Sequence, residues 1–355
     1  MSIVSRHILT PRLEQKFLDT GGKGAPVVFV HGNISTGEFF SDLLLKLPPA
    51  VRGLAPDLRG FGETEAKPIV ASRGLDDFVD DLFSLLSTVE GLEHRRVVLC
   101  GWSVGGAVAL RFTMKHPDRV AGIVLEAPMS PFGFGGTADV VGTPCFADYA
   151  GSGAGTASPP FVERLERKDR SAESNFSPRS IVRSFFIKSG QSLVIEEEDR
   201  LVDEILKTRI GLDHYPGDAA TSPNWPSVAP GSRGMNNAIS PKYMNLSGFP
   251  EIPVKPKVLW VRGDSDQIVS DTSLFCFGFL GQLGLVAGWP GPQIYPPQPM
   301  VSQMRTLLDA YRNRGGQYEE VVFPDCGHSP HLEKPTMFRE QLLSFLTEIQ
   351  FCTPL

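Results

Sequence analysis

RVVLCGWSVGGAVALRFTMKHP, residues 96–117, is the stretch that decides the fold. Its first five residues form an apolar run typical of a buried parallel strand, and residues 104–115 have the small and apolar composition of a helix. Between them, residues 101–105 read GWSVG and match the G-x-S-x-G turn that joins a strand to a helix. The pattern predicts that Ser103 projects from the carboxyl edge of a parallel sheet as a nucleophile, beside a helix amino terminus.

Similar apolar runs, each closed by turn residues, occur on both sides of this stretch. They predict strands at 26–31, 52–56, 121–126, 257–263 and 318–323, and helical spacing occurs at 38–47, 76–89 and 337–349. Strands that alternate with helices indicate βαβ units. The predicted fold class is therefore α/β, a mostly parallel sheet flanked by helices, with residues 1–128 and 257–355 as its core.

Two segments interrupt the alternation. Residues 129–256 are rich in Gly, Ser and Pro, with weak helical patches near 160–170, 178–188 and 196–208, and they predict an inserted cap. Residues 272–304 contain no charged side chain and form a second insertion, within the core. Its aromatic residues Phe275 and Trp289, together with Trp102, are candidates for the lining of an apolar substrate pocket.

Composition and charge exclude several classes of protein. The 355 residues contain 34 Lys and Arg against 40 Asp and Glu, a net charge of -6, and no basic run, so a nucleic-acid partner is not expected. The most apolar stretch, 274–289, falls short of the roughly 18 to 20 residues that span a bilayer, so no stable membrane span is expected. Five scattered cysteines without paired spacing, and an amino terminus without a signal-peptide pattern, predict free thiols and a cytoplasmic location.

A serine nucleophile needs a base, and His328 is the best candidate among seven histidines. It lies in DCGHSPH, residues 325–331, directly after the last predicted strand and therefore at the same sheet edge as Ser103. His331 is its chief competitor, and packing or support of the site is the role expected for it. We therefore predict that His328 takes the proton of Ser103.

The imidazole in turn needs a carboxylate that fixes its tautomer, and two residues are candidates. Asp266 follows the strand 257–263 in the loop GDSDQIV, and Glu126 ends the strand 121–126 at the same edge. The chain order Ser, acid, His holds for both. Asp266 is preferred, with Glu126 as the alternative acid.

Two backbone amides are expected to stabilise the oxyanion of an acyl-transfer intermediate. Val104 supplies one amide by its position after Ser103. HGN, residues 31–33, ends the earlier strand 26–31 and places the Asn33 amide as the second donor. His31 itself is expected to be a structural hydrogen-bonding residue.

Together these motifs resemble the α/β-hydrolase fold family. The resemblance rests on HGN at 31–33, DLRGFGET at 57–64, GWSVGG at 101–106, RGDSDQIV at 262–269 and CGHSPHLEKP at 326–335. It implies Ser103, Asp266 and His328 as a catalytic triad and the amides of Asn33 and Val104 as oxyanion donors. It leaves the cap unmatched. The 62 residues between Asp266 and His328 are more than the family usually has, because residues 272–304 are inserted there.

The expected function is that of a serine hydrolase that cleaves a carboxylic ester or lactone of a moderately sized hydrophobic molecule through an acyl-enzyme. Epoxide hydrolases and haloalkane dehalogenases of this fold use an aspartate where this chain has Ser103, which disfavours those reactions. Two alternatives stay open: hydrolysis of a carbon–carbon bond in a diketone by the same triad, and a ligand-binding protein without turnover. No metal or organic cofactor is expected, and the sequence predicts no oligomeric state.

Overall fold

The computed structural model describes residues 2–188, 190 and 193–351, and its centre is an eight-stranded sheet in the order β1-β2-β4-β3-β5-β6-β11-β12. The strands from β4 to β12 are parallel to one another, whereas β2 runs antiparallel to both β1 and β4. The bounds of these strands are β1 Val4–Leu9, β2 Glu14–Asp19, β3 Ala25–Val30, β4 Val51–Pro56, β5 Val97–Trp102, β6 Val120–Glu126, β11 Lys257–Gly263 and β12 Tyr318–Phe323. The predicted α/β class with a mostly parallel sheet is confirmed.

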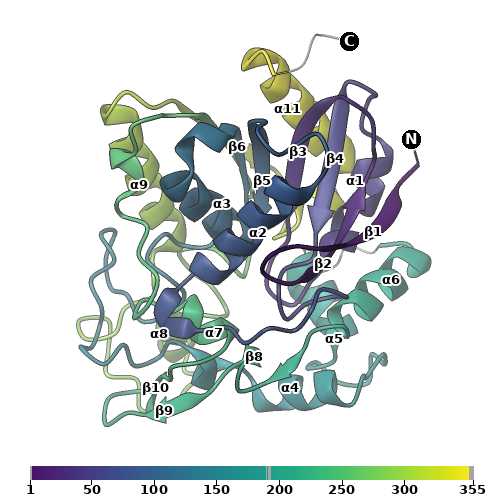
Figure 1. Ribbon diagram of the computed structural model, residues 1–355. Coiled ribbons are helices and arrows are strands. Elements are labelled where there is room, and N and C mark those ends of the chain that lie inside the picture. Colours follow the sequence, from purple (N-terminus) through teal and green to yellow (C-terminus); the bar gives the residue numbers. More distant parts are fainter. Residues whose placement is uncertain (1, 189, 191–192, 352–355) are drawn as a thin grey trace.

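Helices cover both faces of this sheet. In Figure 1, α2 and α3 lie in front of the strands and α11 lies behind them. The helices that accompany the core strands are α1 Ser41–Leu45, α2 Asp76–Thr88, α3 Val104–Lys115, α9 Met300–Asn313, α10 Pro330–Glu333 and α11 Pro335–Glu348. The core is apolar because β3 and β5 are buried along their whole length between these layers.

The two amino-terminal strands were not expected from the sequence. β1 is a mostly exposed edge strand beside β2. Because an exposed strand does not need apolar side chains, its sequence contains no apolar run that would predict it. β2 is buried but contains charged residues that ion pairs satisfy. Lys16 Nζ lies 3.1 Å from Glu38 Oε1 and 3.6 Å from Asp57 Oδ1, and Arg52 Nη2 lies 2.9 Å from Asp19 Oδ2. Burial of paired charges therefore replaces burial of apolar side chains in this strand.

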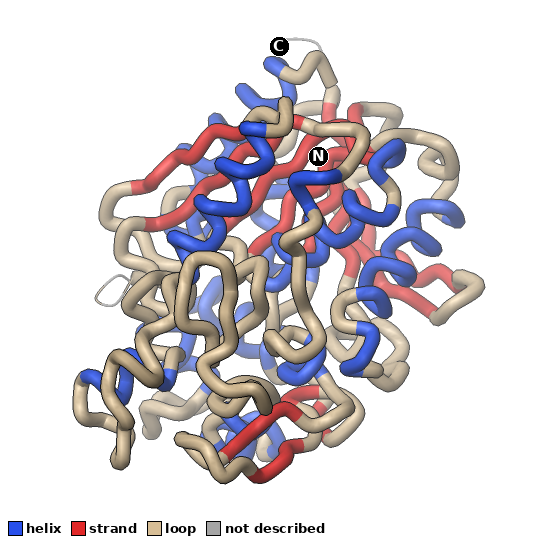
Figure 2. The backbone as a smooth tube through the Cα atoms, turned by 90° about the vertical axis from the view of Figure 1, so that its left-hand side faces the viewer, coloured by secondary structure: helices blue, strands red, loops and turns tan. Residues whose placement is uncertain are grey.

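Residues 129–256 pass below the sheet in the view of Figure 1 and contain short elements joined by long loops, which dominate the lower half of Figure 2. The helices are α4 Pro159–Glu166, α5 Pro178–Ile181, α6 Ile195–Ile205 and α7 Met235–Ala238, with a π-helix at Val182–Phe186. The strands are β7 Ile210–Gly211, β8 Tyr215–Pro216, β9 Ala219–Thr221 and β10 Val228–Pro230, in two small sheets. All three expected helical patches contain helices.

The uncharged segment 272–304 packs against residues 129–256 and ends inside a helix. It contains α8 Phe277–Gln282 and the first turns of α9, a helix that the sequence reading did not anticipate. Two buried glutamines fix the segment: Gln303 Oε1 accepts a hydrogen bond from Ser130 at 2.6 Å, and Gln298 donates to the Gly133 carbonyl at 2.9 Å. The segment is therefore part of the layer at the carboxyl end of the sheet.

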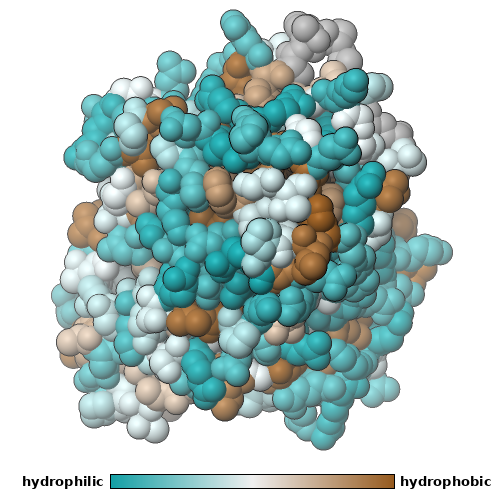
Figure 3. Space-filling view, in the orientation of Figure 1, coloured by the Kyte–Doolittle hydropathy of each residue, from teal (hydrophilic) through white to brown (hydrophobic). Residues whose placement is uncertain are grey.

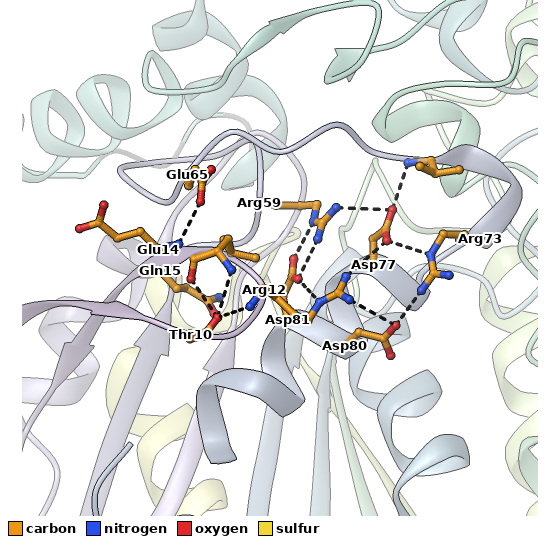
Figure 4. A network of polar contacts seen from close by, with 12 residues as sticks. Thr10, Arg12, Glu14, Gln15, Arg59, Glu65, Arg73, Asp77, Asp80 and Asp81 are labelled. Carbon is orange, nitrogen blue, oxygen red and sulfur yellow. Dashed lines mark hydrogen bonds and ion pairs between the residues drawn. The ribbon is translucent and has the colours of Figure 1, made fainter. Parts of the chain in front are cut away.

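A network of arginines and aspartates joins the β1–β2 turn, the loop after β4 and α2 (Figure 4). The buried carboxylate of Asp81 accepts from Arg59 Nε at 2.6 Å, from Arg59 Nη2 at 2.7 Å and from Arg12 Nε at 2.6 Å. Asp77 accepts from the Val70 amide at 3.1 Å and lies 3.6 Å from Arg59 Nη1. The loop that follows β4 is thereby attached to α2.

Hydrophilic side chains predominate on the face drawn in Figure 3, with apolar ones in small scattered groups. Within the described ranges, the longest apolar helices are too short to cross a bilayer. Cys100, Cys145, Cys276 and Cys326 are free thiols, and Cys352 lies outside the described residues.

Candidate active site

Ser103 lies on a strained turn between β5 and α3. Its backbone has φ 56° and ψ -118°, a conformation that residues with side chains rarely adopt. Glycines on both sides are required by close backbone contacts: a Cβ at Gly101 would lie 2.2 Å from the Gly105 carbonyl oxygen, and one at Gly105 would lie 2.0 Å from the Val30 carbonyl oxygen. The Ser103 amide donates to the Glu126 carbonyl at 2.9 Å, which fixes the turn to β6. The strand-turn-helix context that the G-x-S-x-G pattern requires is present.

His328 and Asp266 meet at the same edge of the sheet. The Nδ1 atom of His328 lies 2.8 Å from Asp266 Oδ2, and both side chains are buried. The other carboxylate oxygen of Asp266 accepts from the Ile268 and Val269 amides at 2.8 and 3.0 Å. The carboxylate is thus held as an acceptor for an Nδ1–H proton, which leaves Nε2 of His328 as the basic nitrogen.

Glu126 has a different partner. Its Oε1 atom lies 2.8 Å from His331 Nδ1 and accepts from the His331 amide at 2.7 Å. Glu126 is fully buried and His331 nearly so. The structure therefore pairs the alternative acid with the competing histidine, and this second pair holds the turn that follows His328 rather than the imidazole of His328 itself.

Trp102 connects β5, the strand that precedes Ser103, to the loop that contains His328. Its indole Nε1 donates to the His328 carbonyl at 2.8 Å, and its ring centroid lies 5.5 Å from that of His328. Phe39 stacks on the indole at 5.5 Å. Because the hydrogen bond is buried, it restricts the backbone position of His328 relative to Ser103.

Asn33 and Val104, whose amides are the candidate oxyanion donors, lie in the turn after β3 and in the first turn of α3. Across residues 2–188, 190 and 193–351, neither amide donates to another group of the chain, and both residues line the same cavity as Ser103. His31 is structural, as expected: its Nε2 accepts from the Leu58 amide at 2.9 Å, and burial lowers its pKa to about 3. His31 is therefore neutral near pH 7.

The cavity at Ser103 and His328 has a volume of about 660 Å³, which suits a small organic molecule. Its wall is largely aromatic and aliphatic and includes Phe134, Phe161, Phe185 and Leu280. None of its described lining residues is an Asp, Glu, Lys or Arg. A ligand with a net charge would lose hydration here without gaining an ion pair.

Of the three residues expected to line the pocket, two line the cavity and one does not. Trp102 and Phe275 belong to the wall, and Phe275 packs edge-to-face on Phe185 at 4.9 Å. The prediction that Trp289 lines the pocket is wrong. Trp289 lies outside the lining and instead packs on Gly281, and its Nε1 atom donates to the Tyr295 carbonyl at 2.8 Å. An uncharged segment signals burial but does not distinguish a pocket wall from internal packing.

Sequence reasoning missed several polar residues of the wall, including Tyr215 of β8 and Asn236 of α7. Both come from the irregular segment 129–256, where no motif marks them.

No candidate metal site is found in the part of the chain that the structure describes, because no group of three His, Cys, Asp or Glu side chains is placed to hold a metal ion.

A comparison with known protein families agrees with the fold. The model of the Alpha/beta hydrolase family matches residues 27–341, so the chain belongs to that family. The match includes both halves of the core and the segments between them.

Individual relatives are more distant. A haloalkane dehalogenase from Mesorhizobium japonicum is 29% identical over 116 residues, which are 33% of this chain and 36% of that enzyme. A 2-hydroxy-6-oxo-2,4-heptadienoate hydrolase from Pseudomonas putida is 34% identical over 125 residues, 34% of this chain and 44% of that enzyme. This chain therefore matches less than half the length of these relatives. A solved structure of a thermophilic esterase from Thermogutta terrifontis superimposes with a TM-score of 0.58 at 22% identity, covering 98% of this chain and 99% of that one, and shows the shared fold.

Proposed function

We propose that the protein is a serine hydrolase that cleaves a carboxylic ester or lactone of a neutral, moderately sized hydrophobic molecule. The observation that carries this proposal is the convergence of Ser103 and His328 on one uncharged cavity, with Asp266 behind His328 at 2.8 Å. Residues 129–256 act in this proposal as the cap that closes the cavity over the substrate.

The reaction proceeds in two acyl transfers. Nε2 of His328 removes the proton of Ser103, whose oxygen attacks the carbonyl carbon, and the Asn33 and Val104 amides bind the resulting oxyanion. Collapse of the intermediate breaks the bond to the alkoxide, which takes the proton from His328. Water then attacks the acyl-enzyme with His328 as base, and the acid product and free Ser103 are released.

Two features favour ester cleavage over the reactions named for the relatives. A hydroxyl at the turn, in place of a carboxylate, supports acyl transfer rather than dehalogenation. The Pseudomonas putida relative is named for a heptadienoate, a carboxylate anion, whereas the described lining here offers no cation to such a group. Hydrolysis of a carbon–carbon bond stays the alternative, and it is favoured instead if p-nitrophenyl esters are not cleaved.

A fluorophosphonate probe tests whether Ser103 is the nucleophile. We expect the wild-type protein to gain one phosphonyl group on the peptide that contains Ser103, because a base-activated serine attacks the phosphorus and displaces fluoride. The variant Ser103→Ala is expected to gain none. Ser184 lines the same cavity outside the turn, so Ser184→Ala serves as the matched control and should be labelled like the wild type. An unlabelled wild-type protein, or a labelled Ser103→Ala variant, would contradict the proposal and favour a binding protein.

A further inference from the structure

One wall of the cavity carries a chain of three uncharged polar side chains that the proposed reaction does not use. Asn33 comes from the turn after β3, Asn236 from α7 and Tyr215 from β8, and all three line the cavity with Ser103. Tyr215 is only 6% exposed. Buried polar groups in an otherwise apolar wall cost free energy unless they are hydrogen-bonded, so the partners of each atom matter.

The contact between the Ile34 amide and Asn33 fixes which side-chain atoms donate and which accept along this series of polar residues. The Ile34 amide can only donate, and it lies 3.1 Å from the Asn33 side-chain oxygen. That oxygen is thereby fixed, and the Nδ2 atom of Asn33 donates to Asn236 Oδ1 at 3.1 Å. The amide of Asn236 consequently turns its own Nδ2 donor away from Asn33.

The next polar side chain of this wall is Tyr215, which lines the cavity beside Asn236. Burial raises the pKa of Tyr215, so the phenol keeps its proton at neutral pH. The contact with Asn236 by itself lowers the pKa of Tyr215, which is the direction expected when the amide NH₂ group faces the phenol oxygen as a donor and leaves the O–H proton for another acceptor. Within the described residues, no hydrogen bond donated by the Tyr215 O–H group is found, and the side chain lines the cavity.

We propose that the Tyr215 O–H group donates a hydrogen bond to the substrate, and that the enzyme therefore selects esters or lactones with a second, neutral acceptor oxygen away from the scissile carbonyl. A ketone, ether or amide oxygen has the required chemistry. The inference rests on the proposed function for the reaction but not for the binding preference, which can be measured without turnover. Carboxylates are disfavoured by the uncharged wall described above.

The preference is measurable because a buried donor penalises a ligand that leaves it unpaired. The test compares p-nitrophenyl octanoate with a set of oxo-octanoate esters in which the ketone is moved one carbon at a time along the chain. We expect at least one oxo ester to exceed the plain ester in kcat/KM by about tenfold or more. In Tyr215→Phe this ratio is expected to fall to near one.

Two further variants separate this role from a general disturbance of the fold. Asn236→Asp keeps an acceptor for Asn33 but replaces the donor that faces Tyr215 by an acceptor, so the phenol proton turns to residue 236 and the ratio is again expected to fall. Tyr318→Phe is the control, because the Tyr318 hydroxyl donates to Asp309 at 2.6 Å and lies outside the cavity lining. This variant should keep the wild-type ratio.

A binding arm distinguishes failure of this inference from failure of the proposed function. Calorimetry measures the affinity of Ser103→Ala for N-methyl oxo-octanamides and for N-methyloctanamide, with and without Tyr215→Phe. A ketone preference that Tyr215→Phe removes supports the donor even if no ester is hydrolysed, in which case only the hydrolase proposal is lost. Equal binding and turnover of oxo and plain ligands at every ketone position, or a preference that survives Tyr215→Phe, would overturn the donor assignment.

Discussion

Asp266→Asn is expected to lower kcat for p-nitrophenyl ester hydrolysis about 10⁴-fold while the protein stays folded. Asp266 holds His328 through Nδ1 at 2.8 Å, and an amide in its place can present an NH₂ group that forces the opposite tautomer. Nε2 of His328 would then carry a proton and could not accept one from Ser103. Steady-state kinetics, with circular dichroism to confirm folding, measures this loss.

Glu126→Gln is the matched control for that measurement. It also converts a buried carboxylate at the same sheet edge into an amide, but its partner is His331. We expect a much smaller loss of kcat than in Asp266→Asn, since the imidazole of His328 keeps its own acceptor. A result in which only Glu126→Gln is crippling would assign the acid to Glu126 and contradict the geometry described here.

Asp81→Ala is expected to give the largest loss of stability, about 3 to 5 kcal/mol in the free energy of unfolding. Its carboxylate accepts two hydrogen bonds from the buried Arg59 and one from Arg12. Removal leaves the Arg59 charge buried with the more distant Asp77 carboxylate and the neutral Pro68 carbonyl as partners. Urea unfolding at neutral pH, followed by circular dichroism, measures the change.

The neighbouring Asp80 provides the control, because it also pairs with basic side chains but is 24% exposed. Asp80→Ala is expected to cost about 1 kcal/mol or less, as is usual for partly solvated pairs. If both variants lose the same free energy, the buried network does not hold the loop after β4 to α2 in the way inferred.

The strands that could be predicted from sequence are those buried by apolar side chains. β3, β5 and β11 are continuous apolar runs, and each is present close to its expected bounds. β2 could not be predicted in this way, because Lys16 and Asp19 are buried through ion pairs with residues distant in the sequence. A pattern of apolar residues does not indicate which distant residues will form ion pairs with a buried charge.

In the candidate site, too, local patterns could be predicted from the sequence, whereas contacts between distant residues could not. The turn at Ser103 is a local strand-turn-helix pattern, so its position and strain follow from residues 101–105 alone. The choice between Asp266 and Glu126 depends on which histidine each carboxylate meets, which chain order leaves open. Tyr215 and Asn236 belong to a segment where long loops set the geometry, and no local motif marks them.

An acyl-enzyme on Ser103 is the central claim, and rapid-quench mass spectrometry with an activated p-nitrophenyl ester tests it most directly. Acylation by such an ester is fast, so deacylation limits turnover and the intermediate accumulates. We predict a burst of p-nitrophenolate equal to the enzyme concentration and one acyl group on the peptide that contains Ser103. An acyl group on another residue, or steady hydrolysis with no acylated protein at any quench time, would contradict the account.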